Sequence, residues 1–270
     1  MYFALYSVHR LYARLDIWRL RPVSRLYQKP PLIEALCEFQ FTDGEWDWTI
    51  PGLVYQQIKD EFPIKRQAPT VEFEVQADLE QVSQRLKGGL GRMQFLREDE
   101  TALVQVGPQL LVVNQLRPYR HWSRFKPLIL DTLEIYRQVA GPAGFKRIGL
   151  RYVNQIQLPS DEVDLSTYFN YGPRLPDPIA SDPIRSLLLR VDLGQISHRG
   201  HLILTLASAP KGDQGGLTLI LDLDFATVSA AHITLDGIGA WIEQAHDRIE
   251  TAFEASITDQ LRALFEEVRP

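Results

Sequence analysis

The chain has 270 residues, of which 45% are hydrophobic and 23% are charged, and its formal net charge is −5. This composition is typical of a globular protein, and the acidic balance argues against a protein dedicated to coating DNA, because phosphate neutralisation needs a clustered basic surface. No apolar run approaches the roughly 20 residues that a membrane-spanning helix requires, and the single Cys37 excludes an intramolecular disulfide. We expect a soluble, cytoplasmic protein.

Residues 1–29 differ in composition from the rest of the chain, since their only acid is Asp16. Their arginines and lysine are Arg10, Arg14, Arg19, Arg21, Arg25 and Lys29. An amphipathic arm for targeting or surface binding is one interpretation, because apolar residues keep helical spacing among the arginines. We favour the other, an extension outside the folded domain, because no apolar signal core with a cleavage site is present.

The folded region begins with two prolines and a strand. In "PPLIEALCEFQF" (30–41), Cys37 lies on the apolar side of the alternation, while Glu34 and Glu38 lie on the other. Cys37 is therefore expected in the core rather than as a nucleophile. We expect the arginines of the later strand 145–158 to be the counterparts of the two acids.

The rest of the first half alternates between helical and extended patterns. A short helix starts near Pro51 and ends near Phe62. Antiparallel strands are predicted over 71–76, 92–99, 102–106 and 109–116. Apolar residues at three- or four-residue spacing predict an amphipathic helix from Trp122 to Ala140, with Ser123 as its cap.

The second half repeats this order of elements. A long strand covers 145–158, and an irregular, proline-dotted stretch follows over 159–184, with a helical turn from Leu165 to Phe169. Three further strands are predicted over 186–193, 201–209 and 217–225. A final helix from Asp236 to Glu267, with an apolar stripe from Ile238 to Leu264, would span about 45 Å.

These elements predict an α+β fold with one large or two adjoining antiparallel sheets. Both halves, 30–141 and 142–270, consist of a strand, a helix or helical turn, three or four strands and a long helix. We expect pseudo-repeated halves that form one compact unit, with the long helices packed on the apolar sheet face.

Four motifs together resemble a sporadically distributed family of uncharacterised prokaryotic proteins of about this length. They are "PPLIEALCEFQF", "VGPQLLVVNQLRPYRHWSRF", "RIGLRYVNQIQLP" and "FEASITDQLRALF", and the resemblance covers roughly residues 28–267. It implies no activity, cofactor or catalytic residue that could be assigned to this chain. The patchy distribution of the family implies an accessory role, such as cargo of a mobile element or part of a defence or toxin–antitoxin system.

Charged residues concentrate on the non-apolar face of the predicted sheet. Strand alternation assigns Arg147 and Arg151, Arg190, and Asp222 and Asp224 to single faces of three strands. A cleft that binds a small anionic ligand through arginine, or that uses a carboxylate pair for acid–base chemistry, is one hypothesis. We favour cross-strand ion pairs on a solvated face, which contribute about 0.2–1 kcal/mol each.

The segment "RPYRHWSRFK" (117–126) is the best nucleic-acid candidate, because basic residues alternate with aromatic ones at the start of a helix. Its candidate ligand-binding residues are Arg117, Arg120, His121, Arg124 and Lys126. The helical stripe also needs Trp122 and Phe125, so we favour core aromatics with a solvated basic rim.

No cofactor or metal is predicted. "GGLG" (88–91) lacks the ending of a phosphate loop, and no HExxH or GxSxG motif occurs. His198 and His201 near Asp222 and Asp224 have no spacing that specifies a metal site. His246 and Asp247 are expected on the solvent-exposed side of the final helix.

Three functional hypotheses follow. The first is a non-enzymatic module that binds a protein partner in a bacterial accessory system, suggested by the missing catalytic motif, the loop 159–184 and the long final helix. The second is a protein that binds or processes nucleic acid through 117–126 and the arginines of 147–151. The third is a small-ligand binder or enzyme on the arginine–aspartate face. The oligomeric state cannot be derived from these patterns.

Overall fold

The computed structural model describes residues 25–268 with several gaps. The gaps are residues 43, 79–80, 120, 161–162, 180–183, 185, 195–199 and 210–215, and for the other residues between 69 and 90 the description covers the backbone only. Most of the arginine-rich segment 1–29, together with Arg120 and His198, therefore lies outside the described residues. No helix among those described is long and apolar enough to cross a membrane.

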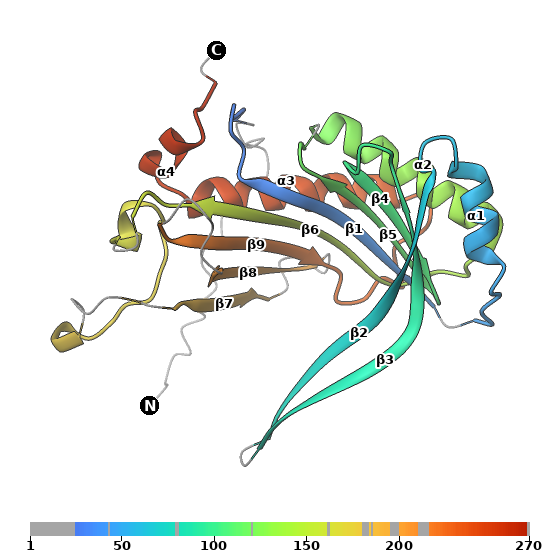
Figure 1. Ribbon diagram of the computed structural model, residues 1–270, viewed down its shortest axis with the longest axis horizontal. Coiled ribbons are helices and arrows are strands. Elements are labelled where there is room, and N and C mark those ends of the chain that lie inside the picture. Colours follow the sequence, from blue (N-terminus) through green and yellow to red (C-terminus); the bar gives the residue numbers. More distant parts are fainter. Residues whose placement is uncertain are drawn as a thin grey trace, which may run out of the picture.

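A single nine-stranded sheet forms the frame of the fold (Figure 1). Its strands are β1 (Leu32–Phe41), β2 (Ile64–Asp78), β3 (Gln81–Leu96), β4 (Ala102–Gly107), β5 (Leu110–Leu116), β6 (Phe145–Gln157), β7 (Leu188–Leu193), β8 (His201–Ser208) and β9 (Thr218–Ala226). Their order is β2-β3-β4-β5-β1-β6-β9-β8-β7, and all neighbours are antiparallel. The predicted α+β class with antiparallel strands is confirmed, in the form of one sheet rather than two.

Two long helices cover the apolar face of this sheet. In Figure 1, α3 (Ile238–Ser256) runs along the sheet against β6 and β9, and α2 (Trp122–Ala140) lies against β5. The shorter α1 (Ile50–Ile58) packs on α2. Strand alternation explains the choice of face, because Ala35, Cys37 and Phe39 of β1 are fully buried while the residues between them are only partly so.

The centre of the sheet is the pairing of β1 with β6. This antiparallel pair places Cys37 opposite Leu150 and Phe39 opposite Ile148, both buried. The other neighbour of β1 is β5, the last strand of the meander that follows β1. The other neighbour of β6 is β9, the last strand of the meander that follows β6. Residues from both halves of the chain therefore meet in one apolar core.

The hairpin β2–β3 projects from the body of the sheet (Figure 1). Its strands pair from Ile64–Leu96 to Asp78–Gln81. β4 pairs with β3 only over Met93–Leu96. The strand predicted at 71–76 is thus part of the much longer β2, and the one predicted at 92–99 is the end of β3, which stops at Leu96.

The predicted final helix is wrong in one respect, since it is interrupted after Ser256. Ile257 is extended (φ −109°, ψ 150°) and forms a β-bridge with Phe169, and α4 (Asp259–Leu264) starts after Thr258. The helical turn predicted at Leu165 is present as the 3₁₀ turn Leu165–Thr167, and a second such turn covers Asp177–Ile179. Leu264, assigned to the apolar stripe, is 40% exposed because α4 takes a new direction.

The start of α2 also differs from the sequence prediction. Ser123 lies inside the first turn, and the cap position is His121, whose backbone has φ 74° and whose carbonyl accepts the amides of Arg124 and Phe125. Pro127 is close enough to the start of the helix to be tolerated, as expected.

Candidate functional sites on the two faces of the sheet

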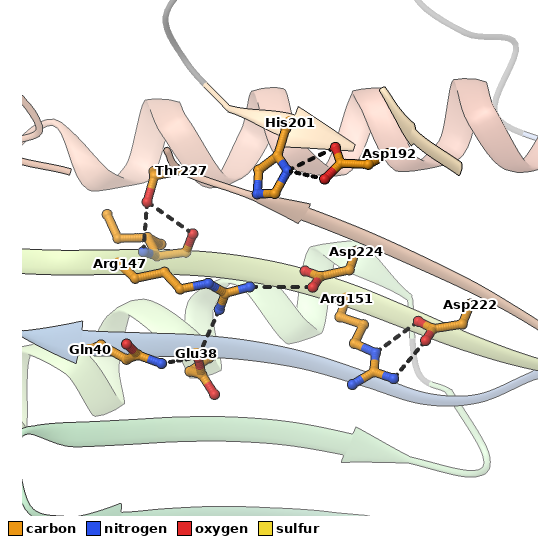
Figure 2. A network of polar contacts seen from close by, with 10 residues as sticks. Glu38, Gln40, Arg147, Arg151, Asp192, His201, Asp222, Asp224 and Thr227 are labelled. Carbon is orange, nitrogen blue, oxygen red and sulfur yellow. Dashed lines mark hydrogen bonds and ion pairs between the residues drawn. The ribbon is translucent and has the colours of Figure 1, made fainter. Parts of the chain in front are cut away.

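The face of the sheet opposite α2 and α3, here called the polar face, carries a cluster of ion pairs (Figure 2). Arg147 of β6 contacts Glu38 of β1 (Nη1–Oε1 2.7 Å) and Asp224 of β9 (Nη2–Oδ2 3.3 Å). Arg151 forms a two-pronged pair with Asp222, at 2.8 Å from Nε to Oδ1 and 2.6 Å from Nη2 to Oδ2. Four of the predicted site residues are therefore brought together across adjacent strands.

Two acids of β1 have different partners. The expected pairing of Glu38 with an arginine of strand 145–158 is confirmed, whereas Glu34 accepts a hydrogen bond from Asn114 Nδ2 at 2.6 Å. Asn114 in turn accepts from Gln105, and Gln105 accepts from Gln94. This chain of amides across β3, β4, β5 and β1 was not predicted, because its partners are far apart in the sequence.

Burial affects the ionisation of this cluster. Asp224 is removed from water between strands, and this desolvation raises the pKa of its carboxyl above the ordinary value despite Arg147 and Arg151 nearby. The hydrogen bonds from Arg151 to Asp222 raise the pKa of the guanidinium. The cluster thus resembles the ion-paired face that we favoured, and its guanidinium groups already face carboxylates rather than open space.

The remaining polar-face candidate is more remote. Arg190 is exposed on β7, where its register partner is Thr205 of β8. His201, at the start of β8, contacts Asp192 (Nδ1–Oδ1 3.0 Å) and not Asp222. Within the described ranges, no group of three or more His, Cys, Asp or Glu residues is arranged to hold a metal ion.

The segment 117–126 lies on the helix-covered side of the sheet. Phe125 is fully buried in the core, and Trp122 stacks on His246 with ring centroids 4.1 Å apart. Lys126 forms an ion pair with Glu243. Arg117 donates to the carbonyl of Pro31 at 3.4 Å, and partial burial lowers its pKa.

Of the described basic residues in this segment, only some face solvent. His121 and Arg124 are exposed at the start of α2, whereas Lys126 is partly covered by its ion pair. The aromatic rings that would have to stack on bases instead pack against the protein. The arrangement agrees with core aromatics and a basic rim, the interpretation that we favoured from the sequence.

His246 contradicts its sequence interpretation. It is 6% exposed rather than on the solvent side of the final helix, because it lies four residues after Ile242 and three before Ile249, on the buried stripe of α3. The spacing was visible in the sequence and indicates burial. The polarity of the side chain was the misleading signal.

A chain of hydrogen bonds runs through His246. Its Nδ1 lies 2.9 Å from the hydroxyl of Tyr152, which lies 3.1 Å from the hydroxyl of Tyr119. Its Nε2 lies 3.3 Å from Oε1 of Glu250, one turn later on α3. Because a carboxylate only accepts, its contact with Nε2 favours the imidazole tautomer with the proton on Nε2, in which Nδ1 accepts from Tyr152.

The two tyrosines remain protonated in this environment. Burial raises the pKa of both Tyr119 and Tyr152 well above the ordinary range of a phenol. These residues, together with Trp122, His246 and Glu250, line a cavity of about 530 Å³, here called the histidine cavity. Sequence reasoning did not find it, because its residues come from β6, α2, α3 and the segment from Arg25 to Leu32, which are far apart in the sequence.

Comparison with protein-family models, with curated proteins and with solved structures finds no match to this chain.

Proposed function

We propose that this protein is a cytoplasmic, non-enzymatic interaction module that uses the hairpin β2–β3 to bind a partner protein. The observation that supports the proposal is the length of the hairpin beyond the sheet. We call the pairs from Thr70–Gly89 to Asp78–Gln81 the arm. A two-stranded ribbon by itself is marginally stable in water, and a third strand or a packed face is normally needed.

The register of the arm separates two kinds of residue. Phe73 pairs with Leu86, whereas Glu72 pairs with Lys87 and Glu74 with Arg85. Because alternate positions of a strand share a face, the arm has one face rich in apolar residues and one rich in charged residues. We propose that the apolar face is the interaction surface, since contiguous apolar patches commonly mark such sites.

The edge position of β2 suggests the chemistry of the partner. β2 is the last strand of the sheet, so its outer backbone groups are free to pair with a further strand. Its alternating acids, Glu72, Glu74 and Asp78, would oppose each other in a dimer of two β2 strands, which is unfavourable. We therefore propose a partner segment that alternates apolar and basic residues.

Other observations favour this proposal over the remaining hypotheses. Among the described basic residues of 117–126, Lys126 is ion-paired while His121 and Arg124 form a narrow rim, and Arg147 and Arg151 of the polar face are matched by acids. A nucleic-acid surface would need unpaired positive charge. The resemblance to sporadically distributed prokaryotic proteins makes accessory systems, such as defence or toxin–antitoxin systems, the first place to seek the partner.

We further propose that the halves 30–141 and 142–270 are pseudo-repeats. This is supported by the neighbouring central strands, β1 and β6, each of which is followed by a meander and a long helix. A similar backbone path in the two halves after superposition would support it, and unrelated paths would contradict it.

The arm can be removed without cutting the sheet. Replacing residues 69–91 by Asn-Gly closes the Ala68–Arg92 pair with a two-residue hairpin loop. We expect the truncated chain to keep its melting temperature within about 5 °C, because the strands of the arm pair only with each other, and to lose its partner. The measurement is capture from the native host by full-length and truncated chains, followed by titration calorimetry with the purified partner.

Charge reversal tests the acidic residues of the arm. The double variant Glu72→Lys with Glu74→Lys should lower the affinity of the partner for the chain at least tenfold. The control is Asp131→Lys, at an exposed position of α2, which should not change this affinity. A partner that binds the truncated chain as well as the full-length one, or repeated capture without any partner, would contradict the proposal.

A further inference from the structure

The structure assigns a second site, independent of the arm. We infer that the histidine cavity binds a small organic cation, meaning an amine with a compact apolar body, and that Glu250 is the counter-ion of its ammonium group. The cavity lies between the start of α2, strand β6, helix α3 and the segment from Arg25 to Leu32.

The size and walls of the cavity fit the apolar body of such a ligand. Its volume of about 530 Å³ lies within the range of small-molecule sites. Tyr27, Trp122 and Phe253 contribute aromatic surface. Aromatic rings favour cations over anions, because the negative face of the ring attracts positive charge.

The charge of the lining selects against an anion. Four carboxylates, those of Glu243, Asp247, Glu250 and Glu254, line the cavity together with one permanent cation, Arg25. With the histidines neutral, the formal charge of this lining is −3, and it is −1 when Lys126 and Arg262, which pair with Glu243 and Glu254 from outside the lining, are included. An ammonium group would gain attraction here, whereas a carboxylate or phosphate would be repelled.

Asp247 is exposed to solvent, and among the other three carboxylates the ion pairs around the cavity single out Glu250. Glu243 is paired with Lys126, and Glu254 contacts both Arg25 (Nε–Oε2 3.6 Å) and Arg262 (Nε–Oε2 3.0 Å). Glu250 instead contacts the imidazole of His246, which has no permanent charge. Its side chain is 28% exposed, so a ligand in the cavity can reach it.

A chain of polar contacts leads from Tyr119 to this carboxylate. In the tautomer with the proton on Nε2, Tyr119 donates to Tyr152 and Tyr152 donates to Nδ1 of His246, while Nε2 lies 3.3 Å from Oε1 of Glu250. The stacking of Trp122 on His246 fixes the plane of the imidazole. The carboxylate is therefore already oriented before the ligand binds, and this preorganisation lowers the entropic cost of binding.

Three probes of nearly the same shape test the inference on the full-length chain. Benzylamine, benzyl alcohol and benzoate differ mainly in charge, and calorimetric titration measures each affinity. We expect benzylamine to bind with a Kd of about 1 mM or tighter, a limit set by its small number of atoms. Benzyl alcohol should bind at least tenfold more weakly, and benzoate should not bind.

A matched pair of variants locates the site. Glu250→Gln should lower the affinity for benzylamine at least tenfold, whereas Glu134→Gln, on the exposed side of α2 and outside the cavity, should leave it unchanged. The truncated chain without the arm should bind benzylamine like the full-length chain, so this inference and the proposed function can fail separately.

Several outcomes would overturn the inference. They are no binding of benzylamine, equal binding of benzyl alcohol, or an affinity that Glu250→Gln does not change. If the Glu250 variant does not fold, the comparison of the three probes on the unaltered chain still decides whether the cavity prefers a cation.

Discussion

Arg147 links three adjacent strands through its two ion pairs. It reaches from β6 to Glu38 on β1 and to Asp224 on β9, and all three side chains are between 20% and 30% exposed. Solvent screening at this exposure keeps the energy of each pair low. The contribution of the cluster is therefore to favour one register of the central strands, because a shift by one residue would move the charged set into the apolar core.

The burial of Asp224 predicts that the stability difference between wild type and Asp224→Asn depends on pH. Desolvation raises the pKa of its carboxyl in the folded state above the ordinary value, so above about pH 4 the folded state holds more protons than the unfolded state. The stability that the protonated carboxyl contributes is then lost as the pH rises through the folded pKa. Asp224→Asn does not titrate, and its stability relative to wild type should increase between pH 4 and 7 in urea unfolding.

Asp222→Asn is the matched control on the same strand. Asp222 accepts two hydrogen bonds from Arg151, so its amide variant should be less stable than wild type at pH 7, by about 0.5–1 kcal/mol. A relative stability of the Asp224 variant that stays constant over this pH range would show that burial does not control the ionisation of Asp224.

Residue types allowed some of these contacts to be predicted. Alternation assigned Glu38 and Arg147 to the polar side of their strands, and the structure pairs them. Alternation could not supply the partner of Glu34, since Asn114 gave no sign of facing an acid. Reasoning from polarity misplaced His246, because its Nδ1 has the hydroxyl of Tyr152 as a hydrogen-bond partner in the interior and its Nε2 lies near Glu250.

The interruption between α3 and α4 depends on contacts with another segment. Asn170 donates to the carbonyls of Ala255 and Ile257, and the amide of Thr258 donates to the carbonyl of Tyr168. Helical periodicity continues through this point, so the sequence predicted one helix. The loop segment 168–170 ends it by satisfying the backbone groups that a further turn would have paired.

Thr258 should be the sensitive residue of this interruption. Its hydroxyl accepts from the amide of Leu261 and donates to the carbonyl of Thr167 at 2.6 Å. Thr258→Ala should lower the free energy of unfolding by about 1–2 kcal/mol, since both a helix cap and a hydrogen bond are lost. Thr258→Ser keeps the hydroxyl and should cost less than about 0.5 kcal/mol. Equal stabilities of the two variants in chemical unfolding would contradict this role.

At the scale of the whole molecule, stability should vary from the centre of the sheet to the arm. β1 and β6 have paired strands on both sides and a helix-covered core face, whereas the arm is two-stranded. Amides in regular pairs exchange with solvent at rates set by local opening.

Hydrogen exchange measured by mass spectrometry can therefore rank the local stability of the central strands and of the arm. Peptides from β1 and β6 should be the slowest and exchange together, because one core joins the two halves. Peptides covering the arm should exchange at least 100-fold faster in the absence of a partner, as expected for a ribbon with little tertiary support. Separate exchange of β1 and β6, or a protected arm, would contradict this account.

The sequence by itself determined the fold class, most strand and helix positions and the face of the sheet that forms the core, because these depend on local periodicity. Only the tertiary structure decided the strand order, the interruption of the last helix and the residues of the histidine cavity. Strand order depends on which apolar faces pack best together over the whole chain. The cavity depends on β6, α2, α3 and the segment from Arg25 to Leu32, which meet only when the sheet and helices are assembled.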